Sequence, residues 1–217
     1  TISYDCRKIK LLNFLLIKKN KIIYIFTFLI FLFPQFCKAN NEDILIQKVY
    51  KLLQEKKFTD SINTLDELSK NNNIQAQLLY SKILFAGSII PQDFNQSYLW
   101  ANIAFLGGLK KSSQLIEMLN NYLTEKQIEE IKENIKIFLE KRAFINDKKA
   151  IIQIAKFYET YMDPPDILNS YSWYSVAVAK GIKSAAKKRD ELLDQIDQKN
   201  LLEAQKLSNK FFKQIQN

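Results

Sequence analysis

The sequence predicts an all-α protein, and three observations support this expectation. Its 217 residues include only four glycines and four prolines, which are too few for the many turns of a β-sandwich. Apolar residues recur at helical spacing among lysine, glutamate, glutamine and asparagine from residue 44 to residue 214. In addition, one stretch of sixteen residues with this helical spacing occurs twice.

The duplicated stretch covers residues 93–108 and residues 166–181, which read DFNQSYLWANIAFLGG and DILNSYSWYSVAVAKG. Both tryptophans of the chain fall at the same offset within it. Composition alone does not produce agreement at so many positions, so we infer an internal repeat. The identical positions are Asp93/Asp166, Ser97/Ser170, Tyr98/Tyr171, Trp100/Trp173, Ala104/Ala177 and Gly108/Gly181.

The repeated stretch has the pattern of a helix that packs closely against another helix. At about 100° per residue, its small residues form a strip about 60° wide with aromatic residues on both sides. Such a strip lets a second helix approach closely, and the flanking rings bury a large apolar area. The strip comprises Ser97, Ala101, Ala104 and Gly108 in the first copy, and Ser170, Ala177 and Gly181, with Tyr174 in place of Ala101, in the second.

Both ends of the repeated helix carry residues that suit helix caps. Asp93 and Asp166 follow prolines and suit the N-cap, and Gln96 completes a pair like a capping box in the first copy. Gly108 and Gly181 suit the left-handed residue that ends a helix. The two copies are therefore expected to start and stop in the same way.

The motif D-x-x-x-[small]-x-x-W-x-x-x-A-x-x-x-G resembles the Sel-one-like repeat, a relative of the tetratricopeptide repeat. The chain departs from that family where Ser81 and Ala155 replace a usual glycine, and only Gly87 remains of the family's glycine-rich loop. The resemblance covers about a third of the chain. It implies a short right-handed α/α solenoid that binds partner proteins. The helix before each copy matches as well, at Ala76, Tyr80, Ser81 and Leu84 and at Ala150, Ile154, Ala155 and Tyr158.

The spacing between the copies predicts two units of four helices each. The copies lie 73 residues apart, and this spacing also aligns Phe138 with Phe211, whereas one helix pair needs only roughly 34–47 residues. We therefore predict a helical hairpin over residues 40–72 and Sel-one-like units over residues 73–146 and 147–217 in one continuous domain. The expected helices span residues 44–55, 58–68, 74–85, 94–106, 112–121, 125–141, 148–161, 167–179, 183–195 and 198–214.

Residues 1–39 have the pattern of an upstream extension followed by an export signal. Three lysines at positions 18, 19 and 21 precede an unbroken apolar run of twelve residues, Ile22 to Phe33, and small residues follow at Cys37 and Ala39. As a helix this run rises only about 18 Å, which is short of the roughly 30 Å hydrocarbon core of a membrane. We predict cleavage after Ala39 and a periplasmic or secreted bacterial protein, with an uncleaved membrane anchor as the alternative.

The composition excludes several classes of catalytic site. The chain has no histidine, and its two cysteines, Cys6 and Cys37, precede the predicted cleavage point. The exported product would lack a His-based triad, a thiol nucleophile and a zinc site, so we expect no catalytic residue, cofactor or metal. Of the net charge of +9, residues 1–39 carry +6, which leaves only +3 for the remainder and argues against nucleic-acid binding.

Three other groups of residues have both a functional and a structural interpretation. The acids around Asp190 and Asp194 could serve an enzyme or activator acting on a cell-wall polymer, but their spacing is typical of a solvated helix face. The basic run at residues 187–189 also suits a solvated face, and the two tryptophans suit the core. We expect a non-enzymatic scaffold that binds another protein or peptide on its solenoid face. A membrane-tethered assembly factor is the alternative if the N-terminal segment stays uncleaved.

Overall fold

The computed structural model describes residues 41–215 of the chain. The chain divides into two compact parts, Thr1–Asn41 and Glu42–Asn217, and the following description concerns the second. The predicted export signal, its cleavage point after Ala39 and both cysteines lie outside the described residues. Residues 41–215 form ten α-helices and two short 3-10 helices without any strand, which confirms the predicted all-α class.

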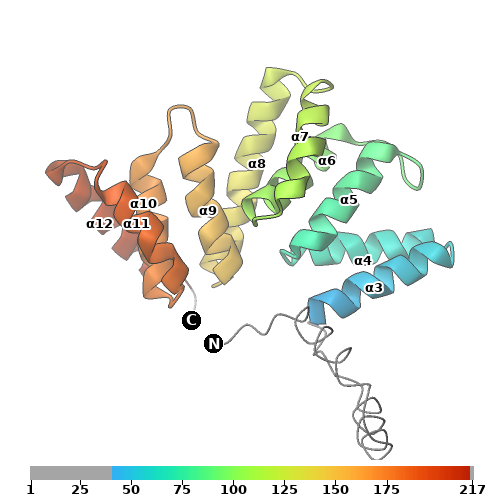
Figure 1. The fold of residues 1–217 in the computed structure, drawn as a ribbon, viewed down its shortest axis with the longest axis horizontal. Helices are drawn as coiled ribbons and strands as arrows, with labels where there is room; N and C mark the ends of the chain where they lie inside the picture. The colour runs from blue at the N-terminus through green and yellow to red at the C-terminus, as the bar shows by residue number, and fades with distance from the viewer. Residues whose placement is uncertain (1–40, 216–217) are drawn as a thin grey trace, which may run out of the picture. The chain divides into compact units, whose positions relative to one another are not determined.

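Consecutive helices pack against one another in chain order (Figure 1). Three predicted ranges match to the residue, namely those of α6, α10 and α12, whereas the helix predicted over residues 183–195 is divided into a 3-10 turn and α11. The α-helices are α3 (Asn41–Gln54), α4 (Phe58–Lys70), α5 (Ile74–Ala86), α6 (Phe94–Leu106), α7 (Ser113–Asn120), α8 (Glu125–Phe144), α9 (Lys148–Thr160), α10 (Ile167–Ala179), α11 (Ala186–Leu193) and α12 (Gln198–Gln214). The 3-10 turns are Lys110–Ser112 and Lys183–Ala185.

The duplicated helices α6 and α10 begin with the same cap. The Asp93 carboxylate accepts a hydrogen bond from the backbone N–H of Gln96 at 2.9 Å, and the Asp166 carboxylate accepts one from Asn169 at 3.0 Å. Each bond satisfies one of the backbone donors that a helix start leaves unpaired. The predicted N-caps are therefore confirmed.

The same two helices also end in the same way. Gly108 and Gly181 adopt left-handed φ values of 96° and 84°. The residue after each glycine donates its N–H back to an alanine carbonyl, from Leu109 to Ala104 at 3.0 Å and from Ile182 to Ala177 at 2.9 Å. This is the Schellman arrangement, which confirms the predicted glycine caps.

Small residues bring each duplicated helix close to the helix before it. Ser97 is fully buried and donates its Oγ–H to the Ser81 carbonyl of α5 at 2.8 Å. At the same place in the second copy, Ser170 donates to the Ala155 carbonyl of α9 at 3.0 Å. Side chains longer than serine or alanine would hold the two backbones too far apart for these bonds.

One part of the predicted small-residue strip is wrong. Ala101 and Ala104 are fully buried, but Gly108 is exposed, and a Cβ built on it would meet no atom within 4 Å. The strip ends at Ala104 because Gly108 has already left the helix in its left-handed conformation. The close contact is made one residue earlier, since a Cβ on Gly107 would overlap the Cγ2 methyl group of Ile74.

Each tryptophan is covered by an aromatic residue from the last helix of its own group of four. Trp100 meets Phe138 of α8 edge-on, with ring centroids 5.5 Å apart, and Trp173 stacks on Phe211 of α12 at 4.5 Å. The two indoles are only 5% and 0% exposed, so both belong to the core, as predicted. The groups α5–α8 and α9–α12, hereafter the first and second groups, thus repeat the same central contact.

The hairpin α3–α4 adds a smaller apolar cluster to the first group. Val49 of α3 and Leu65 of α4 are completely buried against Ala76 and Ile83 of α5. Within residues 41–215, no helix is both long enough and apolar enough to cross a membrane.

Replacing Trp173 by alanine should lower the free energy of unfolding by about 3–5 kcal/mol, because the fully buried ring leaves a cavity against Phe211. Urea unfolding followed by circular dichroism measures the loss. Trp173→Phe retains a ring at this site and should cost less. Equal unfolding midpoints for wild type and Trp173→Ala would show that the ring does not support the core.

Replacing Ala177 by leucine should cost about 1–3 kcal/mol, because this fully buried position faces closely packed atoms. The matched control is Ala179→Leu, two residues further along the same helix, where the side chain is exposed and the change should stay within about 0.5 kcal/mol. Thermal unfolding of both variants measures the two losses of stability. Similar losses in both variants would contradict the close packing of α10.

Candidate binding pocket

The residues that define the sequence repeat either pack between helices or cap the helix ends. The aspartates cap helices and the glycines close them, while the other pairs lie in buried contacts. Of the whole set, Gly181 lines the pocket described below. The set with buried side chains comprises Ala76, Ser97, Tyr98, Trp100, Ala104, Ala150, Ser170, Tyr171, Trp173 and Ala177.

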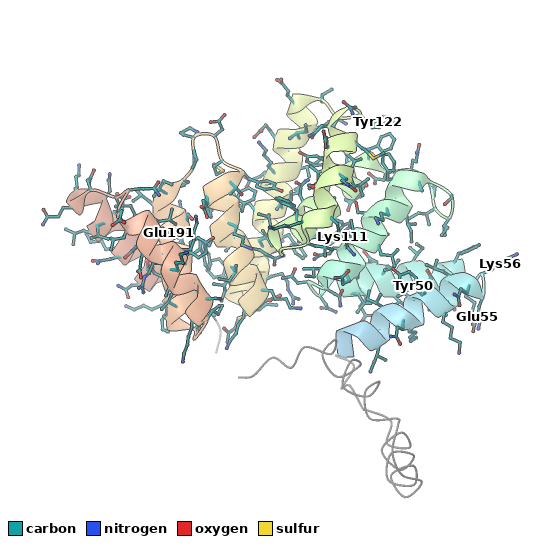
Figure 2. All side chains as sticks on the ribbon, viewed as in Figure 1. Tyr50, Glu55, Lys56, Lys111, Tyr122 and Glu191 are labelled. Atoms are coloured by element: carbon teal, nitrogen blue, oxygen red, sulfur yellow. The ribbon has the colours of Figure 1, made fainter. Side chains whose placement is uncertain are left out.

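The acidic residues near the start of the last helix lie on the surface and bind neighbouring groups. Glu191 of α11 is exposed (Figure 2) and pairs with Lys188 at 3.3 Å. Asp190 pairs with Arg189 at 2.6 Å, and Asp197 caps α12 by accepting the N–H of Asn200 at 2.8 Å. Among the described residues, no three acidic, cysteine or histidine side chains gather where a metal ion could bind.

A pocket of about 550 Å³ lies where the two groups meet. Its walls come from the first turns of α9, the start of α5, the end of α6 and the turn after α10. Helix ends converge there because the Schellman turns at residues 107–109 and 180–182 redirect the chain beside α9. The lining residues are Ile74, Leu106, Gly107, Lys148, Lys149, Ile152, Gln153, Lys156, Gly181, Ile182 and Lys183.

Among the described residues that line the pocket, four are lysines and none is acidic. Lys148 and Lys183 are exposed, and neither forms an ion pair within residues 41–215. The acid nearest in sequence, Asp147, is engaged elsewhere, because it caps α9 and pairs with Arg142 at 2.9 Å. An anion entering the pocket would therefore meet the positive charges of Lys148 and Lys183.

Lys156 reaches the inner wall of the pocket. Its Nζ donates to the carbonyl of Leu106, the last residue of α6, at 3.2 Å. Burial lowers the pKa of Lys156 below its ordinary value, because the charged form is partly removed from water. The contact also places a cation at the negative end of the α6 dipole.

A buried network of polar side chains fixes the walls of the pocket relative to each other. Asn72, in the turn before α5, donates to the Gln153 side chain of α9 at 2.7 Å and to Asp147 at 3.1 Å. It accepts from Gln77 of α5 at 3.1 Å. Gln153 in turn donates to the Ile103 carbonyl of α6 at 3.0 Å. The network joins three helices, and Gln153 itself lines the pocket.

The lysines of the pocket were not predicted from the sequence, where the basic run at residues 187–189 was the candidate instead. The structure pairs that run with acids, since Lys188 contacts Glu159 at 2.7 Å and Arg189 contacts Asp190. The sequence did contain a signal for two of the pocket lysines, because lysine recurs at equivalent places in the two groups. The equivalent pairs are Lys82 with Lys156 and Lys110 with Lys183. The signal was weak because lysine is common along the whole chain.

Comparison with protein-family models and with curated proteins finds no match to this chain. The resemblance to the Sel-one-like repeat accordingly stays a prediction.

Replacing Asn72 by glycine should lower the free energy of unfolding by about 1–3 kcal/mol, because Gln77 of α5, Gln153 of α9 and the N-cap Asp147 each lose a hydrogen bond. Glycine tolerates the φ of 60° at this position, so the change isolates the amide group. Asn146→Gly is the matched control, since Asn146 has a φ of 64° and its buried Oδ1 has no hydrogen-bond partner. Equal effects in chemical unfolding would show that the network contributes nothing.

Proposed function

We propose that the protein is an exported, non-enzymatic interaction scaffold of the Sel-one-like type, which binds a segment of another protein. The pocket between the two groups carries this proposal, because it is a concave site with mixed charged and apolar walls. The domain division proposed with it is a helical hairpin over residues 40–72 and repeat units over residues 73–146 and 147–217.

The recurrence of contacts supports a short right-handed α/α solenoid. Helix caps, the serine-to-carbonyl bond and the tryptophan–phenylalanine contact recur at a spacing of 73 or 74 residues. Stacked units of this kind present the surface between neighbours as an extended binding site. The pocket occupies such a position, since α5 and α9 begin at equivalent places in the two groups.

The chemistry of the pocket favours binding over catalysis. Its lining offers lysine, isoleucine, leucine, glutamine and glycine, without a carboxylate, thiol or hydroxyl group that could act as base or nucleophile. The amine nearest to the interior, that of Lys156, is held by the Leu106 carbonyl. The export part of the proposal is supported by the basic and apolar pattern of residues 1–39.

Photo-crosslinking tests the scaffold proposal in the cells that make the protein. A benzophenone amino acid at position 149, in the pocket wall, should form a covalent adduct with a discrete partner protein. The same amino acid at position 126 of α8, where the lysine side chain is 87% exposed and lies outside the pocket lining, should not. Absence of a protein adduct at position 149, or the same adducts at both positions, would contradict the proposal, as would turnover of a cell-wall glycan by the purified protein.

A further inference from the structure

We infer that the pocket between α6, α9 and α10 binds an acidic segment of a partner protein that carries both carboxylates and apolar side chains. The inference rests on the proposed scaffold function and names the chemistry of its partner. Nothing in the sequence repeat assigns this site, because its charged residues lie outside the repeated motif.

The charge of the pocket selects an anionic ligand. Lys148 and Lys183 line the pocket from the start of α9 and from the 3-10 turn after α10, and both side chains are exposed. A carboxylate in the pocket would gain from both charges, because no acidic residue is among the described residues of the lining.

The apolar walls of the pocket favour a ligand that carries apolar side chains as well as negative charge. Ile74, Leu106, Ile152 and Ile182 line the pocket together with the lysines. A free phosphate would leave these walls in contact with water, whereas leucine or isoleucine side chains would cover them. A volume of about 550 Å³ is in the range of sites that enclose several side chains.

Two other occupants fit the pocket less well. Single-stranded nucleic acid gains much of its affinity from stacking on aromatic rings, and no aromatic residue lines the pocket. The chain's own N-terminal segment carries a charge of +6 over residues 1–39, which is the same sign as the pocket. Charge therefore opposes docking of that segment.

The direct test is fluorescence anisotropy of the full chain with labelled peptides in which Asp and Glu alternate with Leu, Ile, Val and Phe. Members of this set should bind at least about tenfold more tightly than the same peptides with Asn and Gln, because the pocket lysines recognise carboxylates. The double variant Lys148→Gln/Lys183→Gln should weaken that binding at least about fivefold. The matched control is Lys82→Gln/Lys110→Gln, which removes two exposed lysines outside the pocket lining; its affinity should stay within about twofold of wild type.

Several results would overturn the inference. Equal weakening of peptide binding by both double variants would show a general charge effect. Equal affinity for acidic and neutral peptides, or no binding of any acidic peptide, would show that the pocket does not recognise carboxylates. Tighter lysine-dependent binding of an oligo-dT strand would assign the pocket to nucleic acid. If the adduct at position 149 persists in Lys148→Gln/Lys183→Gln, the inference of an acidic ligand is wrong, but the proposed scaffold function is still supported. If no protein adduct forms at all, the scaffold function itself fails.

Discussion

The structure depends on the close approach of two helices within each group, α5 with α6 and α9 with α10. The approach requires a serine on the second helix, because Ser97 and Ser170 each donate to a backbone carbonyl of the first. It also requires alanine two turns later, at Ala104 and Ala177, where a larger side chain would separate the backbones. With the pair fixed, the tryptophan on the neighbouring face is held against the last helix of the group, and the core forms around it.

The two groups satisfy this constraint in different ways. In the first, Ser81 and Ser97 exchange two hydrogen bonds, of 2.7 and 2.8 Å, across the helix contact. In the second, Ala155 replaces Ser81 and only the bond from Ser170 is left, at 3.0 Å. Tyr174, which stands where the first copy has Ala101, reaches across to Glu159 of α9 at 3.2 Å. Burial raises the pKa of Tyr174, so its hydroxyl group stays protonated and can donate.

The pocket follows from how the groups are joined and not from either group alone. Its inner wall combines α6 of the first group with α9 of the second, and Asn72, Gln153 and Asp147 hold these elements through buried hydrogen bonds. Buried polar networks of this kind define one geometry, since any displacement leaves a donor or acceptor unpaired. The lysines then face a shared space, because the end of α6 and the turn after α10 both lie against α9.

The helices, their caps and the burial of the tryptophans could be predicted from sequence, because they depend on local spacing and on residues such as Asp93, Gly108 and Trp173. The same spacing placed Gly108 wrongly in the packing strip, since periodicity cannot show where the chain leaves the helix. That Lys148, Lys156 and Lys183 line one pocket follows from the tertiary fold alone. The lining residues lie up to 109 positions apart in the chain, from Ile74 to Lys183, and they meet through the joining of helix ends, which no local pattern encodes.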